Sequence, residues 1–290
     1  MILAAHAFTS VSMDTGVNVQ VIAAEPREQV EVSVQRALAW FDTVERICTR
    51  FDPTSEVMQL LHQVGKAVPV STLLFESIAF ALDLADQTNG AFDPTIGASM
   101  EQLGFNTNYR TGESINTPVD ARAMTFRDVK LDRATRTVRL RRPLVLDLNA
   151  VAKGLAIDLA ARELEAYPDA YVEAGGDVFV RGHNPTGAPW RIGVQHPRAD
   201  GLAYTLEVTD TAVCTSGDYE RHGHILDART HQPVAALASV TVTAPTAMAA
   251  DGLSTAAMVL GPERGLSFLK EQGVGGLFIA PDGTVTRVNL

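Results

Sequence analysis

The sequence predicts an α+β fold, and three observations carry that prediction. Residues 17–23 alternate apolar with polar side chains, which is typical of a strand with one buried face. In residues 28–48, apolar side chains recur every three or four positions, which indicates a long amphipathic helix. Two apolar stretches near the end, 274–279 and 285–288, flank Pro281-Asp-Gly283 and predict a β-hairpin.

Size and composition favour one folded unit. The chain has 290 residues, of which 46% are hydrophobic, enough to bury the core of one sizeable domain or of two closely packed lobes. No change in composition marks a linker, and we find no internal repeat or low-complexity tract. We therefore expect a single compact unit over residues 1–290.

After the long helix, the first half of the chain predicts further helices separated by polar breaks. A proline and several capping residues follow it, and Ser55 is suited to cap a short helix that ends near His62. Ser71 opens the next helix. We expect that helix to end at Asn89-Gly90, because both residue types tolerate a left-handed backbone.

The second half mixes strands with helices. Residues 144–154 predict a buried strand that runs into a helix carrying Asp158, and residues 171–182 predict two strands around a glycine pair. We expect polar turns at 215–221 and 222–230. The other predicted strands are 137–140, 190–195 and 203–209, and the other predicted helices are 248–260 and 263–272.

Charge and cysteine content restrict the partners. The net charge of −10 argues against nucleic acid or an anionic membrane, because like charges repel. No stretch approaches the roughly 20 apolar residues of a spanning helix. The start of the chain lacks the features of a signal peptide, so we expect a cytoplasmic protein, although a form trimmed of an export signal would look the same. Cys48 and Cys214 lack metal-ligand spacing and predict buried, inert thiols.

Residues 247–261 are small and apolar except for a few polar side chains. Among these, Asp251 and Thr255 stand four positions apart and share one face of a helix. They are either a locally satisfied polar pair or two oxygen ligands for a cation such as Mg²⁺.

Lys153 lies near a predicted helix N-terminus, where the helix dipole disfavours a cation. It is either a solvated surface lysine or the partner of an anion.

Taken in order, the segments resemble the ApbE family, the FAD:protein FMN transferases, over nearly the whole chain. Each matching motif is weak alone, but their shared order is strong. The motifs are Met13-Asp-Thr15, Arg50-Phe-Asp-Pro-Thr-Ser55, Gly90-Ala-Phe-Asp-Pro-Thr95, Leu103-Gly-Phe105, Asp147-Leu-Asn-Ala-Val-Ala-Lys-Gly154 with Asp158, Gly175-Gly176, Thr215-Ser-Gly217 and His224-Ile-Leu-Asp227. The resemblance implies an ApbE-like, T-fold-like unit with a mixed, mostly antiparallel sheet flanked by helices.

The resemblance also implies a reaction and a site. FMN would pass from FAD to a Thr or Ser hydroxyl of an acceptor protein with a Ser/Thr-Gly-Ala-Thr type sequence, and AMP would leave. Mg²⁺ would act on the pyrophosphate as Lewis acid and template. Its implied ligands are Asp251, Thr255 and the backbone carbonyl of Ala150. The implied flavin contacts are Met13, Phe51, Ala91, Phe92, Asp93, Lys153 and Ile225, with Ser216 and Gly217 as further candidates.

His224 is the group in these motifs best able to move a proton near neutral pH. It is either the base that assists the attacking hydroxyl or a group that positions substrate. Residues 227–231, Asp-Ala-Arg-Thr-His, lack the proline and glycine of the family pattern, so we expect that loop to sit differently. Asp14 replaces a glycine of the family near the cofactor.

Three other functions remain open at this stage. A Mg²⁺-dependent FAD pyrophosphatase would use the same residues with water as the acceptor. A non-catalytic protein that stores or delivers FAD would bind it without chemistry. A domain without a cofactor would leave the glycine loops and Lys153 without a purpose.

Overall fold

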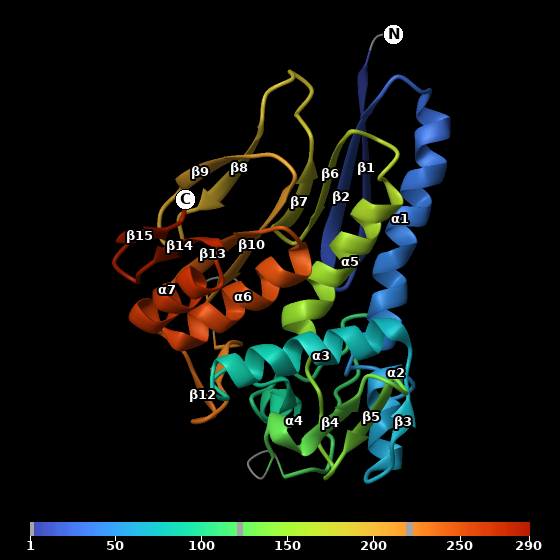
Figure 1. Ribbon diagram of the computed structural model, residues 1–290, viewed down its shortest axis with the longest axis vertical. Helices are drawn as coiled ribbons and strands as arrows, with labels where there is room; N and C mark the ends of the chain where they lie inside the picture. The colour runs from blue at the N-terminus through green and yellow to red at the C-terminus, as the bar shows by residue number, and fades with distance from the viewer. Residues whose placement is uncertain (1–2, 121–123, 219–222) are drawn as a thin grey trace.

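An eight-stranded sheet forms the centre of the protein in a computed structural model, which describes residues 3–120, 124–218 and 223–290 (Figure 1). Each pair of neighbouring strands in it is antiparallel, and the predicted α+β fold is confirmed. In spatial order the strands are β1 (Ala4–Ser12), β2 (Thr15–Ala23), β6 (Asp169–Ala174), β7 (Asp177–Arg181), β10 (Thr211–Gly217), β13 (Ser239–Ala244), β14 (Gly275–Ile279) and β15 (Val285–Val288).

Helices cover one face of this sheet, and a hairpin covers the other. The helices, which pack side by side in the order given, are α1 (Arg27–Cys48), α5 (Asn149–Glu163), α6 (Ala247–Leu260) and α7 (Pro262–Glu271) (Figure 1). The hairpin consists of β8 (Trp190–Gln195) and β9 (Leu202–Val208). Its Trp190 and Leu206 join Val178 and Val180 of β7 in a second, smaller apolar cluster. Phe179, which stands between those two valines, packs against the main cluster, so alternate side chains of β7 reach opposite faces of the sheet.

A smaller group of elements lies beyond one end of the sheet and its helices (Figure 1). It contains α2 (Glu56–Gln59), α3 (Thr72–Gln87), α4 (Gly97–Gln102), the sheet β3 (Val68–Pro69), β5 (Thr137–Leu140) and β4 (Val129–Asp132), and the short 3₁₀ helices Leu60–Gln63, Pro94–Ile96 and Phe126–Asp128. The short strands β11 (Leu226–Asp227) and β12 (Gln232–Pro233) pair with each other. Buried side chains from this group and from the main sheet belong to one hydrophobic cluster.

The helix ends follow the predicted capping residues. Ser55 accepts a hydrogen bond from the amide of Met58, and Ser71 accepts one from Leu74. Asn89 and Gly90 adopt φ of 53° and 76° just after α3, so the left-handed end is confirmed. These caps begin and end the helices where the sequence predicts.

Two local predictions are wrong. Residues 144–148 form no strand, because the buried carbonyl of Val145 accepts from Gly97 at 3.1 Å instead of joining a sheet. Thr215–Gly217 is part of β10 and not of a turn, since it pairs in register with β13. The hydroxyls of Thr215 and Thr241 face each other across that pair at 2.9 Å, which explains polar residues on a strand. The rest of the two predicted turns includes residues 219–222, which lie outside the described ranges.

Candidate active site

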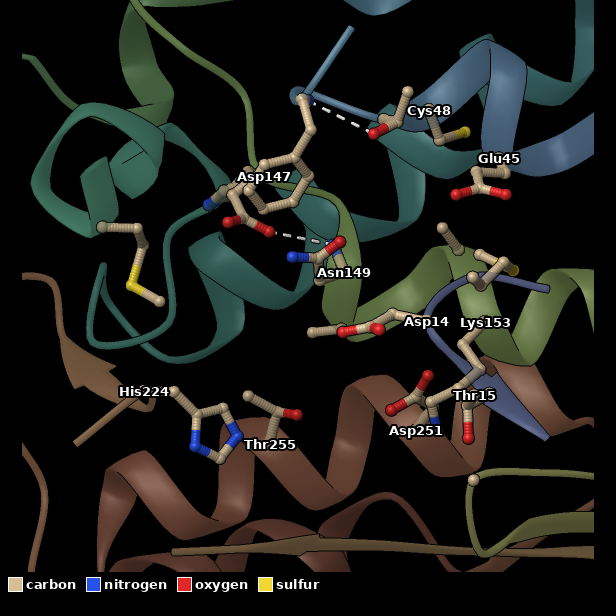
Figure 2. Close-up of a pocket in the computed structure, with 18 of the residues that line it drawn as sticks. Asp14, Thr15, Glu45, Cys48, Asp147, Asn149, Lys153, His224, Asp251 and Thr255 are labelled. Atoms are coloured by element: carbon tan, nitrogen blue, oxygen red, sulfur yellow. Dashed lines mark hydrogen bonds between the residues drawn. The ribbon is translucent and has the colours of Figure 1, made fainter. Parts of the chain in front are cut away.

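A cavity of about 720 Å³ opens where the β1–β2 turn, α1, α5 and α6 meet (Figure 2). Most of the predicted site residues line it: Met13, Phe51, Phe92, Asp93, Ala150, Lys153, Ser216, Gly217, His224, Ile225, Asp251 and Thr255. Ala91 does not line it, because that residue is fully buried and its carbonyl accepts from the amide of Ala228 at 3.0 Å. Segments far apart in the sequence thus converge on one site.

One side of the cavity is a polar surface, which we call the floor: Lys153, Ser216, Asp251 and Thr255 line the cavity, and the buried Asp177 pairs with Lys153. Asp251 and Thr255 lie on the same side of α6, as predicted (Figure 2). The Asp251 carboxylate is 6% exposed, and one of its oxygens accepts from the amide of Gly154 at 3.2 Å. Burial raises the pKa of Asp251, while the charge of Lys153 lowers it.

Close contact between α5 and α6 brings the floor together. A Cβ at Gly154 would lie 2.4 Å from the carbonyl oxygen of Ala247, so only glycine permits this helix crossing. Asp158, one turn further along α5, accepts from the amides of Ala247 and Met248 at 2.6 and 2.9 Å and caps α6. Burial raises the pKa of Asp158 to about 6.

The hydroxyl of Thr255 is fixed by neighbouring hydroxyls. Ser216 Oγ lies 2.8 Å from Thr255 Oγ1 and 2.8 Å from Ser254 Oγ. Ser254 in turn donates to the carbonyl of Asp251. This network holds the Thr255 side chain in one orientation, and it connects β10 to α6.

The donor set of the floor fits a hard cation. The described residues contain no group of three or more His, Cys, Asp or Glu side chains that would hold a metal ion. The candidates here are one buried carboxylate, the Thr255 hydroxyl and the carbonyl of Ala150, which are all oxygen donors suited to Mg²⁺. The Asp251 carboxylate has more lone pairs than the Gly154 amide uses, and a cation would offset the cost of burying its charge.

Lys153 has an anionic partner within the protein. Its ammonium forms an ion pair with the Asp177 carboxylate, which is 2% exposed and also accepts from the amide of Thr215 at 2.8 Å. The Lys153 side chain is 26% exposed and lines the cavity. Of the two interpretations left open by the sequence, the solvated surface lysine is therefore wrong.

Asp93 stabilises its own loop. Its carboxylate accepts from the amide and hydroxyl of Thr95 at 2.9 and 2.7 Å and from the amide of Phe126 at 2.8 Å. Burial raises the pKa of Asp93, and these hydrogen bonds lower it. A hydrogen bond from a cofactor to Asp93 stays a prediction, and it would use an acceptor that already has three protein donors.

Arg50 is a supporting residue to which the sequence analysis assigned no role. Its guanidinium is 2% exposed, contacts Asp147 at 2.7 Å and donates to the carbonyl of Phe105 at 2.6 Å. It also stacks 4.1 Å from the centre of the Phe51 ring. Arg50 thus joins three of the matching motifs. The sequence did contain one signal for this contact: Arg50 and Asp147 carry opposite charges, and each stands within one of the matching motifs.

The exposed side of the cavity, which we call the rim, was also missed: Asp42, Glu45, Tyr109 and Arg110. Arg110 contacts Glu45 at 2.5 Å and Asp42 at 3.1 Å, and its side chain is 53% exposed. Polar residues on an exposed helix face give no sequence signal for such contacts. Tertiary contact between α1 and the 109–110 segment is what assembles the rim.

Asp14 and His231, one residue from each departure from the family pattern, occupy left-handed backbone. Met13 and Asp14 have φ of 52° and 60°, which defines a two-residue type I′ turn between β1 and β2. His231 has φ of 57°, and its Nδ1 lies 2.9 Å from Ser99 Oγ. Asp and His tolerate this conformation better than most residues. The 227–231 loop therefore keeps a turn of the kind that glycine would favour.

His224 and the two cysteines complete the description of the cavity. His224 lines the cavity together with Thr255 (Figure 2), and its ring packs edge-on against Phe105 with 6.5 Å between centroids. Cys48 lines the cavity wall but is buried, and burial raises its pKa to about 12. Cys214 is fully buried, so the prediction that both thiols are buried is confirmed, and their low reactivity stays a prediction.

The fold and the cavity together define the class to which this protein belongs. It is an α+β protein whose cavity is large enough for a dinucleotide and has a lysine and a candidate cation site at its floor. Within the described residues, no helix is long and apolar enough to cross a membrane.

Comparison with known proteins identifies the family. The profile of the ApbE family matches residues 13–278, and the chain belongs to this family. FAD:protein FMN transferase of Klebsiella pneumoniae is 30% identical over 94% of this chain and 83% of its own length. The corresponding protein of Vibrio cholerae is 32% identical over 75% and 70%.

Solved structures agree with the sequence comparison. The ApbE protein of Thermotoga maritima has a TM-score of 0.87 and 28% identity, over 99% of this chain and 97% of that one. The flavinyl transferase ApbE of Pseudomonas stutzeri has a TM-score of 0.85 and 29% identity, over 99% and 95%. The predicted resemblance to the ApbE family is thus confirmed, and it is a family of flavin transferase enzymes.

Proposed function

We propose that this protein transfers FMN from FAD to a Ser or Thr hydroxyl of an acceptor protein and releases AMP. The observation that carries the proposal is the buried Asp251 carboxylate, which accepts from Gly154 of α5, one helical turn from the fixed Thr255 hydroxyl in the same cavity. Membership of the ApbE family, with relatives named FAD:protein FMN transferase, supports it. The acceptor would carry a Ser/Thr-Gly-Ala-Thr type sequence, and a cytoplasmic location stays a prediction.

The proposed reaction is a phosphoryl transfer. The acceptor oxygen forms a bond to the riboflavin-side phosphorus of FAD, and the bond from that phosphorus to the bridging oxygen breaks. AMP keeps the bridging oxygen, and FMN stays on the acceptor as a phosphoester. The hydroxyl proton passes to a ring nitrogen of His224, which lines the same cavity as Thr255.

Mg²⁺ held by Asp251, Thr255 and the Ala150 carbonyl would neutralise charge on the diphosphate as a Lewis acid. The protein's own side chains orient the reactants. Ser216 fixes the Thr255 hydroxyl, and Asp177 fixes the Lys153 ammonium where it reaches the cavity. A positive side chain there helps a protein of net charge −10 to bind an anion.

Incubation with FAD and Mg²⁺, with and without an acceptor domain that bears such a sequence, tests the proposal. AMP release and the acceptor's intact mass are measured together. We expect AMP to form in step with an FMN adduct on the acceptor. AMP release that ignores the acceptor would instead identify an FAD pyrophosphatase, and tight FAD binding without AMP would identify a delivery protein.

Substitutions of two cavity residues test whether the transfer reaction takes place at this site. His224→Ala and Thr255→Val should each lower the transfer rate by about 10² or more, in the range typical of general acid–base groups and of charge-stabilising groups. Val32→Ala, at an exposed residue of α1, is the matched control for protein handling. Transfer that survives both the His224 and the Thr255 variant unchanged would contradict the proposal.

A further inference from the structure

The first strand of the sheet has an open edge that leads to the cavity. β1 pairs with β2 on one side, and no strand in the described parts of the chain pairs with its other side. Its last residue leads into the turn where Met13, Asp14 and Thr15 line the cavity. The open edge therefore ends at the turn that lines the cavity.

The hairpin geometry shows which backbone groups face outward. The two-residue turn makes Ser12 and Thr15 the hydrogen-bonded pair closest to it. Pairs alternate along an antiparallel ladder, so the next residues of this type on β1 are Ser10 and Phe8. Val11 and Thr9 lie between them and turn their N–H and C=O groups away from β2.

Two recorded contacts agree with this alternation. The carbonyl of Ala7, two residues before Thr9, accepts from Arg27 Nη2 at 3.0 Å and so points away from β2. The carbonyl of Gly16, opposite Val11, accepts from the amide of Gly175 at 3.2 Å and so points toward β6. The backbone of Val11 and Thr9 is therefore turned toward the open edge.

The open edge lacks the features that usually protect edge strands. β1 has nine residues without Pro, Lys, Arg, Asp or Glu, and Val11 is 74% exposed. The opposite edge strand, β15, has four residues, of which one is Arg287. Long uncharged edges are templates for pairing, which proteins normally prevent with charge, proline or short length. Because Arg27 covers Ala7, the unprotected part is the half of β1 nearest the cavity.

We propose that the acceptor segment bearing the reactive hydroxyl docks as an added β-strand along Thr9–Val11 and continues past the turn into the cavity. The inference rests on the proposed function and names how its protein substrate is held. An extended chain advances about 3.3 Å per residue, so three residues beyond Val11 span roughly 10 Å. That reach takes a side chain from the open edge past the Met13–Asp14 turn.

The surface also specifies the chemistry of the segment. Main-chain hydrogen bonds provide affinity in strand addition, so the segment needs free amides and no proline where it pairs. The exposed Asp42 carboxylate at the rim and the net charge of −10 disfavour an acidic segment. The occupant is therefore an extended, non-acidic stretch without proline where it pairs, and it carries a Ser or Thr.

A proline at Val11 tests the docking directly. Val11→Pro removes an outward N–H but no bond of the β1–β2 ladder, since that N–H does not face β2. With an acceptor domain bearing a Ser-Gly-Ala-Thr sequence, we expect KM for the acceptor to rise about tenfold or more. FAD affinity and kcat should stay within about twofold, because no group of the floor changes. Val285→Pro, at an exposed residue of β15, is the matched control and should leave KM unchanged.

Hydrogen exchange in the unchanged protein gives a second readout that no folding defect can affect. Saturating acceptor should slow exchange of the Thr9 and Val11 amides by about tenfold or more. An unchanged KM in a folded variant, or no protection in the unchanged protein, would overturn the proposal. A dimer that Val11→Pro dissociates without a change in acceptor kinetics would assign the edge to a second copy and also overturn it. No transfer by the unchanged protein would defeat the proposed function, and the docking inference with it.

Discussion

The floor and the rim of the cavity use similar charged groups in opposite environments. At the floor, Lys153 pairs with Asp177, whose side chain is 2% exposed. Arg50, which supports the site, pairs with Asp147, and these two side chains are 2% and 8% exposed. At the rim, the Arg110 and Asp42 side chains are 53% and 68% exposed. Buried charges are costly to unpair, whereas exposed pairs contribute little. The buried groups therefore fix the geometry of the site, and the rim tolerates change.

The largest contrast should be in activity. Asp251→Ala removes the single carboxylate among the proposed Mg²⁺ ligands, and we expect transfer to fall about 10³-fold or more. Asp42→Ala removes a rim carboxylate and should change the rate less than about threefold. Initial rates of FMN adduct formation at saturating FAD measure both. Equal losses in the two variants would show that the floor has no special role.

The second contrast is in stability. Arg50→Met leaves the buried Asp147 carboxylate without its cation, and we expect the free energy of unfolding to fall by about 3–5 kcal/mol. Arg110→Met breaks an exposed pair with Asp42 and a pair with Glu45, whose side chain is 14% exposed and keeps contact with water, and it should cost less than about 1 kcal/mol. Urea unfolding followed by circular dichroism measures the two values. A rim variant as unstable as Arg50→Met would contradict the comparison.

The third prediction concerns how the stability of the protein depends on pH. The pKa of Asp158 rises on folding from 3.8 to about 6, so the folded state binds its proton more tightly than the unfolded state. Its contribution to stability is fully present below pH 3.8 and is lost as pH rises through about 6, a difference of roughly 3 kcal/mol. Asp158→Asn should remove this component from the pH dependence of unfolding between pH 4 and 7. An identical pH profile in the variant would show that Asp158 does not titrate in this way.

The smallest effect concerns the helix crossing beneath the floor. Gly154→Ala would bring a Cβ to 2.4 Å from the Ala247 carbonyl oxygen, so α5 and α6 must separate, at a cost of about 1–3 kcal/mol. Gly16→Ala is the matched control, because a Cβ there meets nothing within 4 Å. Thermal unfolding of the two variants tests this, and equal melting temperatures would argue against a tight crossing.

Local signals predicted much of the fold. Ser71 and Asn89 mark the ends of α3 because capping and left-handed turns depend on neighbouring residues. The 144–148 stretch misled the prediction, since an apolar run reports burial and not strand pairing. β13 was missed although its sequence, Ser-Val-Thr-Val-Thr-Ala, alternates polar with apolar residues; five of these six residues are buried in the structure.

The candidate site was predictable only in part. The spacing of Asp251 and Thr255 predicts a shared helix face, which the structure has, because helix periodicity is a local property. The role of Arg50 depends on Phe105 and Asp147, which are distant in the sequence, and no local pattern reports such contacts. The hydroxyl contact between Ser216 and Thr255 likewise exists only once β10 packs against α6.

The most direct test of the account is how strongly Mg²⁺ tightens FAD binding. Calorimetric titration of FAD in Mg²⁺ and in EDTA should show at least about tenfold tighter binding with Mg²⁺ in the unchanged protein, in line with common coupling energies. In Asp251→Ala we expect the two affinities to agree within about twofold. An undiminished Mg²⁺ effect in that variant would mean that the ion binds elsewhere, and the proposed site would be wrong.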